Sequence, residues 1–258
     1  MNRKDFTEML ETIAPKELAL SYDNVGLLIG TDREIRKVLV ALDCTIAVAR
    51  EAVDIGADLV LTHHPLFFHG VNRILPDDPE TAAAYLLIRN GIGLYAAHTN
   101  LDAADGGVND ALAETLGVSN CRPLCEDGIG RVGVLQKPMP LRDFVQLCNA
   151  SLHTTVRFFG DPDRMVQTVG LVGGAGGGNV DDAARCGCDV YVTGEMKHHE
   201  VLRAEFYHLP CVVAGHYETE VVVLKKWISR LQNAENDVQY YETSLGKAPL
   251  MTHEEDEQ

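Results

Sequence analysis

The sequence is poor in basic residues and has no long apolar run, and both absences exclude classes of protein. Lys and Arg number 22 against 38 Asp and Glu, so the formal net charge is -16 over 258 residues. That charge disfavours binding to a nucleic-acid backbone or an anionic membrane surface. No stretch approaches the roughly 18 apolar residues of a membrane span, and the first residues lack the apolar core of a signal peptide. We therefore expect a cytoplasmic protein that contacts neither membrane nor nucleic acid.

The sequence also lacks any C-x-x-C motif. Its seven cysteines are scattered and odd in number, which favours a reducing compartment over a disulfide framework. Most of them are expected to be small buried apolar residues. Cys186 and Cys188 flank a glycine between an expected helix and strand, and we interpret them as packing residues rather than ligands of a soft metal.

Nucleotide-binding and serine-hydrolase motifs are missing as well. The glycine-rich run Gly173–Gly178 has neither the G-x-G-x-x-G register nor the Lys-Ser/Thr of a P-loop. It lies between an expected strand and helix, where bare N–H groups can meet a phosphate or carboxylate. The alternative is a tight turn that lets neighbouring loops approach each other. A bound dinucleotide is not expected, and no G-x-S-x-G nucleophile motif occurs.

What the sequence does contain is an internal repeat at a constant offset of 131 residues. Glu51–Thr62 and Asp182–Thr193 share Ala, Gly, Asp and Thr at matching positions of one helix-turn-strand pattern. Further strands and amphipathic helices extend the match in both directions. The connection from the matched Thr is 36 residues to His98 in the first copy and 23 to His216 in the second. The alternative to duplication is two βαβ units that resemble each other for packing reasons.

Each copy is expected to fold as helix, strand, strand, helix, strand, helix, strand, helix, with last helices at Val108–Leu116 and Val221–Leu231. Short Val-, Leu- and Ile-rich strands that alternate with helices predict an α/β fold. We expect two similar α/β halves with mostly parallel sheets flanked by helices, and a metal site at their junction. The halves are predicted at residues 1–124 and 125–250, followed by a solvated acidic tail at 251–258.

Three histidine-containing segments each follow an apolar run that predicts a buried strand. They are His63-His64, His98–Asp102 and His216–Glu220, and the last two share the pattern His-x-x-x-carboxylate. Ligands at the carboxyl ends of strands gather at one edge of an α/β sheet. Imidazole and carboxylate together suit a transition metal. Any one segment alone is typical of a hydrogen-bonded turn or a helix start, but three at matched points favour a metal site.

Adjacent side chains at a strand end point in different directions, so His63 and His64 fit two neighbouring ions better than one. Asp102 and Glu220 then supply oxygen ligands, either of which can bridge, and His216 supplies a third nitrogen. Two ions that share a water molecule are a standard arrangement for metal-assisted hydrolysis. Zinc, iron, manganese and nickel all suit this ligand set.

Two further residues are candidates for catalysis. His98 can transfer protons, bind metal or orient another ligand. Glu195 falls 131 residues after His64, which predicts a place near the site, although an acid at a helix start is the alternative. His198 and His199 copy the dipeptide without following a strand, so we expect them on an exposed helical face.

These segments, with Tyr22–Leu27, Ala41–Asp43, Gly173–Gly176 and Thr193–Glu195, resemble the Nif-three-like dinuclear metal-centre family, whose members are often labelled GTP cyclohydrolase 1 type 2 homologues. The resemblance spans almost the whole chain and implies metal ligands at His63, His64, Asp102, His216 and Glu220, with Glu220 as the bridge. It also implies a toroidal homohexamer whose sites face an internal cavity. Some members carry an extra domain between the halves, for which this chain is too short.

Three functions follow from these expectations. The first is a metal-dependent hydrolase of a small anionic or nucleotide-like substrate. The second is GTP cyclohydrolase proper, in which water attacks the purine ring. The third is a protein without catalytic activity that holds metal or serves as an interaction scaffold. The motifs favour the first, because opening of the GTP ring cannot be read from five ligands.

Overall fold

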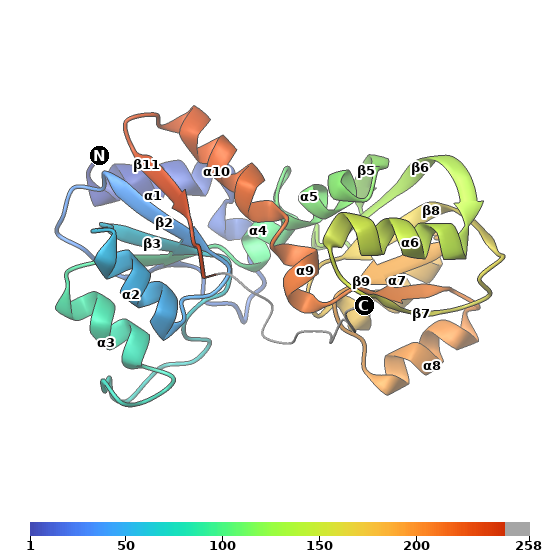
Figure 1. Ribbon diagram of the computed structural model, residues 1–258, viewed down its shortest axis with the longest axis horizontal. Helices are drawn as coiled ribbons and strands as arrows, with labels where there is room; N and C mark the ends of the chain where they lie inside the picture. Colours follow the sequence, from blue (N-terminus) through green and yellow to red (C-terminus); the bar gives the residue numbers. More distant parts are fainter. Residues whose placement is uncertain (246–258) are drawn as a thin grey trace, which may run out of the picture. The chain divides into compact units, whose positions relative to one another are not determined.

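The computed structural model describes residues 1–245, which form two compact units. The first unit comprises Met1–Gly107 together with the chain from Val223, and the second comprises Val108–Val222. Each unit contains one β-sheet with helices on both faces (Figure 1). The predicted α/β class with two sheets flanked by helices is therefore confirmed. The expected tail at 251–258 lies outside the described residues.

The first unit contains six helices, of which one is a short 3-10 turn, and five strands among the described residues. They are α1 (Arg3–Ile13), η1 (Lys16–Leu18), β1 (Gly26–Ile29), β2 (Lys37–Ala41), α2 (Ile46–Asp54), β3 (Leu59–Thr62), α3 (Ala82–Arg89), β4 (Gly93–Ala96), α4 (Thr99–Ala103), α10 (Val223–Ala234) and β11 (Gln239–Glu242). Its sheet has the order β1-β4-β3-β2-β11, in which only β1 runs antiparallel to its neighbour.

The second unit contains a six-stranded sheet. Its elements are α5 (Val108–Thr115), β5 (Val118–Pro123), β6 (Arg131–Pro140), α6 (Leu141–Leu152), β7 (Arg157–Phe159), β8 (Met165–Val172), η2 (Gly176–Asn179), α7 (Val180–Arg185), β9 (Val190–Thr193), α8 (His198–Phe206), β10 (Cys211–Val213) and α9 (His216–Glu220). The strand order is β5-β6-β8-β9-β10-β7. Only the neighbouring pairs β8–β9 and β9–β10 are parallel, so this sheet is mixed and not mostly parallel as expected.

The strand pairing reproduces the internal repeat. The order β1-β4-β3-β2 in the first sheet matches β7-β10-β9-β8 in the second, with β1 and β7 antiparallel at the corresponding place. In the first sheet Val40 pairs with Leu61, and in the second Leu171 pairs with Val192, so the register is preserved at the offset of 131. The duplicated skeleton consequently delivers Thr62 and Thr193 to equivalent strand ends.

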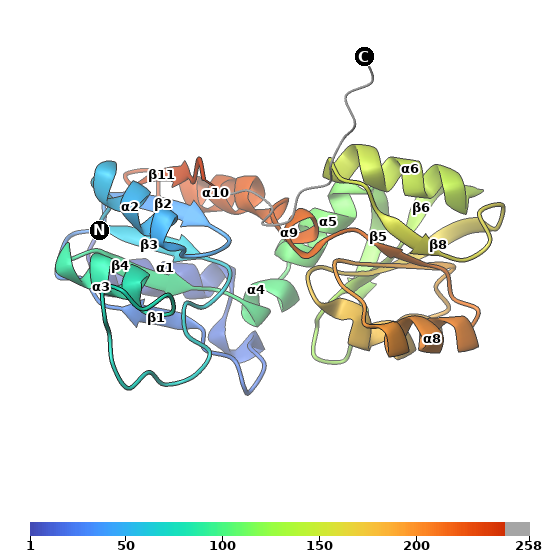
Figure 2. The same ribbon diagram turned by 60° about the horizontal axis from the view of Figure 1, so that its bottom comes forward.

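The faces of the two sheets are covered in the same way. In the first unit α2 and α3 pack on one face, while α1 and α10 pack together and α10 contacts β2 (Figure 2). In the second unit α5 and α6 contribute to one apolar cluster, and α7 and α8 to another. Because helices cover both faces of each sheet, a central strand has no solvent-exposed face. This explains why β3 and β9 are buried at every residue.

The last helix and strand of each copy lie in the other unit. Helix α5 and strand β5 follow the first copy along the chain but belong to the second unit, whereas α10 and β11 follow the second copy and complete the first sheet beside β2. The sequence halves 1–124 and 125–250 and the compact units consequently do not coincide. Among residues 1–245, no helix is long and apolar enough to cross a membrane.

Candidate metal centre

His63 and His64 lie directly after β3, where the backbone continues the parallel ladder. The N–H of His63 donates to the carbonyl of Ala41, and that of His64 to the carbonyl of Leu42. Because successive residues of a strand face opposite ways, the His63 side chain is fully buried and that of His64 is 19% exposed. The two ring centroids are nevertheless only 4.9 Å apart. The pair thus presents two imidazoles to one region, although its two residues come from opposite faces of the strand.

His98 joins them from the start of α4. Its ring centroid lies 5.2 Å from that of His63 and 5.6 Å from that of His64. Each of the three rings offers a nitrogen, and these three atoms lie within 4.8 Å of one another. We call His63, His64 and His98 the histidine cluster. The third nitrogen ligand available within the first unit is therefore His98.

A hydrogen bond to Nδ1 orients each ring of the cluster. His63 Nδ1 lies 2.9 Å from the carbonyl oxygen of Ala97, which can only accept, so this nitrogen carries the proton and Nε2 carries the lone pair. His64 Nδ1 lies 2.9 Å from Asp43 Oδ1, and His98 Nδ1 lies 2.9 Å from Asp23 Oδ1. Such partners fix the tautomer and raise the basicity of a metal-binding imidazole.

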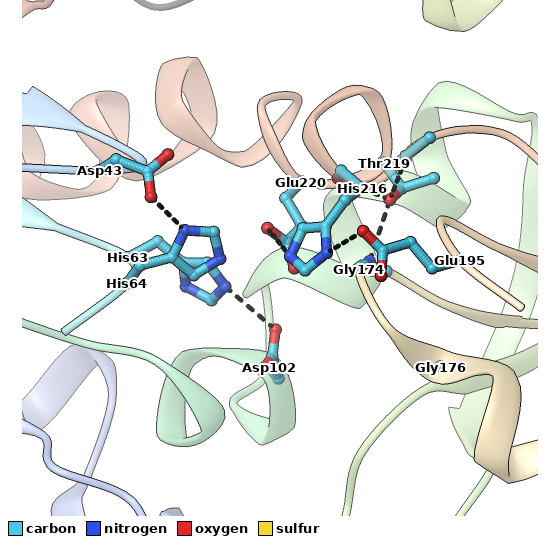
Figure 3. Close-up of polar contacts among 12 residues, drawn as sticks. Asp43, His63, His64, Asp102, Gly174, Gly176, Glu195, His216, Thr219 and Glu220 are labelled. Carbon is cyan, nitrogen blue, oxygen red and sulfur yellow. Dashed lines mark hydrogen bonds and ion pairs between the residues drawn. The ribbon is translucent and has the colours of Figure 1, made fainter. Parts of the chain in front are cut away.

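Asp102 approaches the cluster from the last turn of α4. Its Oδ1 lies 3.7 Å from Nε2 of His63, the nitrogen that carries the lone pair. Figure 3 shows His63, His64 and their carboxylate neighbours Asp43 and Asp102. The first unit thus combines imidazole nitrogens and a carboxylate oxygen, a donor set that suits divalent transition metals.

Asp23 is a site residue to which sequence reasoning gave no role. Its carboxylate is fully buried and accepts hydrogen bonds from His98 Nδ1, from the Thr99 N–H at 3.0 Å and from the Thr99 hydroxyl at 2.5 Å. Burial acts to raise the pKa of Asp23, but these hydrogen bonds and the charge of His98 outweigh it, and the pKa falls well below its usual range. The carboxylate therefore stays ionised and holds His98 in place. Asp43 was missed likewise, because nothing in the sequence links it to His64.

The second unit carries a smaller group at the start of α9. His216 Nε2 lies 3.2 Å from Glu220 Oε2, one helical turn away, and Nδ1 lies 3.1 Å from Glu195 Oε1. The Glu220 residue is only 4% exposed. We call His216 and Glu220 the His–Glu pair, and Glu195 orients the imidazole of His216 (Figure 3). Asp23 orients His98 in a similar way. A buried carboxylate beside an oriented imidazole also fits a divalent metal.

The glycine-rich run makes room for this pair. A Cβ atom at Gly174 would lie 2.1 Å from Glu220 Oε1 and 3.1 Å from His216 Nε2. Gly174 also has a φ of +62°, which other residues rarely adopt. A Cβ at Gly194 would lie 2.6 Å from the carbonyl oxygen of Gly174. The tight-turn interpretation of the run is therefore confirmed.

Three backbone N–H groups of the run donate hydrogen bonds within the fold. Gly173 donates to Asn109, Gly174 to Thr219 and Gly176 to Thr193. A carboxylate oxygen of Glu200 lies 2.1 Å from where the Cβ of residue 177 would be. An anion would compete with these partners and meet the negative charge of Glu200. The structure gives no support to a phosphate cradle at this loop.

Other sequence expectations can be located in the second unit. His198 and His199 are exposed in the first turn of α8, as expected. Glu195 precedes that helix and contacts His216, so it lies beside the His–Glu pair instead of starting the helix. Cys186 and Cys188 occupy the turn before β9 and contribute to an apolar cluster. Burial raises the pKa of Cys188 to about 12, which makes its thiol unreactive at neutral pH.

Comparison with known proteins extends these observations. Over 260 residues the chain is 37% identical to a protein of Clostridium perfringens named GTP cyclohydrolase 1 type 2 homolog, covering 97% of this chain and 99% of that protein. A Streptomyces coelicolor protein of the same name is 37% identical over 82% of this chain and 79% of its own length. A crystal structure of a Bacillus cereus protein related to NIF3 superposes with a TM-score of 0.92, at 26% identity, covering 98% of this chain and 99% of that one.

The family match covers all the residues of the candidate site. Residues 1–249 match the family described as Duf34/NIF3 (NGG1p interacting factor 3). The matched region contains both copies of the repeat, the histidine cluster and the His–Glu pair. The chain therefore belongs to the Duf34/NIF3 family.

Proposed function

We propose that this protein is a metal-dependent hydrolase that binds two divalent ions through the histidine cluster and the His–Glu pair. The observation that carries the proposal is the histidine cluster, in which three imidazoles are each oriented through Nδ1 and offer nitrogens within 4.8 Å of one another. The ligands we propose are His63, His64, Asp102, His216 and Glu220. When bound, divalent ions would supply Lewis-acid polarisation and water activation.

His98 has the surroundings of a proton-transfer residue. Its Nδ1 is held by the ionised Asp23, so the imidazole can accept a proton at Nε2 and the resulting positive charge is stabilised. The His98 side chain is 17% exposed, which gives a small substrate access to it. Glu195 is largely exposed and holds the His216 ring. We assign it to orientation of that ring and to proton exchange with solvent.

Metal content and hydrolysis test the proposal together. We expect protein purified without added metal to contain close to two ions of zinc, iron, manganese or nickel per chain by elemental analysis. His64→Ala should lose metal and activity on a panel of nucleotides, cyclic amides and phosphoesters. His199→Ala, an exposed histidine of α8, is the matched control and should keep both. Metal-loaded protein that hydrolyses none of the panel would contradict the proposal.

Hydrolysis of GTP is the second candidate, because relatives with 37% identity carry the name GTP cyclohydrolase 1 type 2 homolog. Release of formate from GTP, absent in His64→Ala, would establish it. The third candidate, a metal-holding scaffold, would be supported if every coordination position proved to be filled by protein. A homohexamer is a further proposal, tested by light scattering for six times the chain mass of 28.2 kDa.

A further inference from the structure

The two copies of the repeat differ most in the loop that follows the matched threonine. In the first copy, residues 63–81 separate β3 from α3; in the second, residues 194–197 separate β9 from α8. The additional length noted in the sequence therefore lies entirely in this loop, directly after His63 and His64. Long irregular loops in compact domains are usually functional. The second copy has only the four residues 194–197 at this place, so most of the loop has no counterpart in the repeat.

This loop forms one wall of a cavity of about 500 Å³ within the first unit. Phe67, Phe68, Val71 and Ile74 line it from the loop, Asn24 from the segment before β1, and Ile88 from α3. The volume lies in the ~300–1,000 Å³ range of small-molecule sites. The lining combines aromatic and aliphatic side chains with the polar side chains of Asp23, Asn24 and His69.

Hydrogen bonds hold the wall in place. The Asn24 side-chain amide donates to the carbonyl of Phe67 at 2.6 Å, and the N–H of Leu75 donates to the Thr81 hydroxyl at 3.0 Å. Between these two anchors the Phe68 side chain remains 49% exposed, and Ile88 opposite is 50% exposed. Apolar side chains that are exposed to solvent around a cavity indicate a surface that binds a ligand.

The cavity adjoins the histidine cluster through two residues. Asp23, which orients His98, also lines the cavity. The Phe68 ring stands edge-on to the His98 ring, with centroids 5.6 Å apart. A group that occupies the cavity therefore lies beside the imidazole to which we assign proton transfer.

We propose that this cavity binds a planar heteroaromatic ring of the substrate, which stacks against Phe68 and directs the scissile bond to the histidine cluster. Three aromatic side chains, Tyr22, Phe67 and Phe68, line it, and ring pairs prefer the offset or edge-on contacts that such a lining allows. Asn24 and His69 add polar groups for the nitrogen and oxygen atoms of a heterocycle. The statement about the scissile bond rests on the proposed hydrolase function, whereas ring binding does not.

Binding measurements on the intact protein test the inference. Guanosine, nicotinamide and quinoline-2-carboxylate serve as ring probes, with ribose 5-phosphate and cyclohexanecarboxylate as non-aromatic controls, in titration calorimetry. We expect at least one ring probe to bind and neither control to do so. Phe68→Ala should weaken ring binding about tenfold or more, and Phe68→Tyr should preserve it. Phe206→Ala, which removes an exposed phenylalanine of α8 in the second unit, is the matched control and should change nothing.

A second variant fills the cavity and leaves the lining side chains of the loop in place. Ile88→Trp should abolish ring binding while the thermal unfolding midpoint and the metal content stay unchanged. The inference is overturned if no ring probe binds at millimolar concentration, or if binding is equal in wild type, Phe68→Ala and Ile88→Trp. Metal-stripped protein separates the two proposals, because none of the proposed metal ligands lines the cavity. Ring binding without hydrolysis would contradict only the proposed hydrolase function. Hydrolysis of non-aromatic substrates at a rate that Phe68→Ala does not change would contradict only the proposed ring site.

Discussion

The two copies of the repeat place different chemistry on one strand skeleton. At the end of β3 the first copy presents His64, whereas the end of β9 presents Glu195 at the matched position. Asp43 of the first copy, which holds His64, corresponds to Gly174 of the second, which leaves room for Glu220. The backbone register is conserved and the donor atoms are not. The two equivalent strand ends thus differ in chemistry, since one is rich in imidazole and the other is rich in carboxylate.

The same contrast extends to the helices that the copies exchange. Helix α5 is tied to its new unit by Asp110, which receives two hydrogen bonds from Arg131 of β6, at 2.8 and 2.9 Å. The Arg131 side chain is 3% exposed and also donates to the carbonyls of Gly128 and Gly130. Helix α10 instead uses the partly exposed Arg230, whose guanidinium donates at the protein surface to the carbonyl of Asp105. The two exchanged helices should therefore respond differently to loss of their polar anchors.

The largest effect is expected for Asp110→Ala. It leaves a buried guanidinium without its carboxylate, so the free energy of unfolding should fall by about 3 kcal/mol or more. Arg230→Ala, the matched change on α10, should cost under about 1 kcal/mol because the group lies at the protein surface. Urea denaturation measures both. Equal losses in the two variants would show that the exchanged helices are anchored alike.

A smaller loss is expected for Gly174→Ala. The added Cβ would collide with the Glu220 carboxylate and force a methyl group into a left-handed backbone conformation, at a combined cost of about 2–3 kcal/mol. Metal content should fall with it, since the His–Glu pair must move. Gly178→Ala in the same run is the control, because its Cβ would meet nothing within 4 Å. If Gly174→Ala retained its full metal content, Gly174 would not be required for metal binding.

Asp23→Asn should change the stability of the first unit by an amount that depends on pH. The folded protein lowers the pKa of Asp23, so its carboxylate adds stability above the unfolded pKa of about 3.9 and loses it as pH falls through the folded value. Wild type should exceed the variant by about 1–3 kcal/mol at pH 7, and the gap should shrink once pH drops below about 4. Chemical unfolding at several pH values measures the gap. A gap independent of pH would mean that the ionised form is not what folding favours.

The smallest effect on folding is expected for Asp43→Asn. The Asp43 carboxylate is 54% exposed, so its contact with His64 should contribute no more than about 1 kcal/mol to stability. Metal affinity should nevertheless fall about 10- to 100-fold, as is usual when the partner of a metal-binding histidine is lost. Competition with a chelator gives the affinity. An unchanged affinity would leave Asp43 without a part in orienting His64.

The fold class and the proximity of His63, His64 and His98 could be read from the sequence because both follow from local order. The hydrophobic periodicity, the internal repeat and the ends of the strands can all be recognised in the sequence. The carboxyl ends of parallel strands then lie at the same edge of a sheet. Asp23 and Asp43 could not be found, because their partners lie 75 and 21 residues away and no spacing rule links them. The exchange of α5 and α10 was missed for a similar reason. An amphipathic helix shows which face it buries but not against which sheet.

The exchange of terminal elements affects the order in which the chain can fold during synthesis. Among the described residues, the second unit is the continuous segment Val108–Val222, so these residues have all been made before α10 and β11 are synthesised. The first unit starts earlier, yet its sheet lacks an edge strand until Gln239–Glu242 appears and pairs with β2. Domains made first usually fold first. Here β2, which is made before the second unit, keeps an unpaired edge until β11, which is made after that unit, pairs with it.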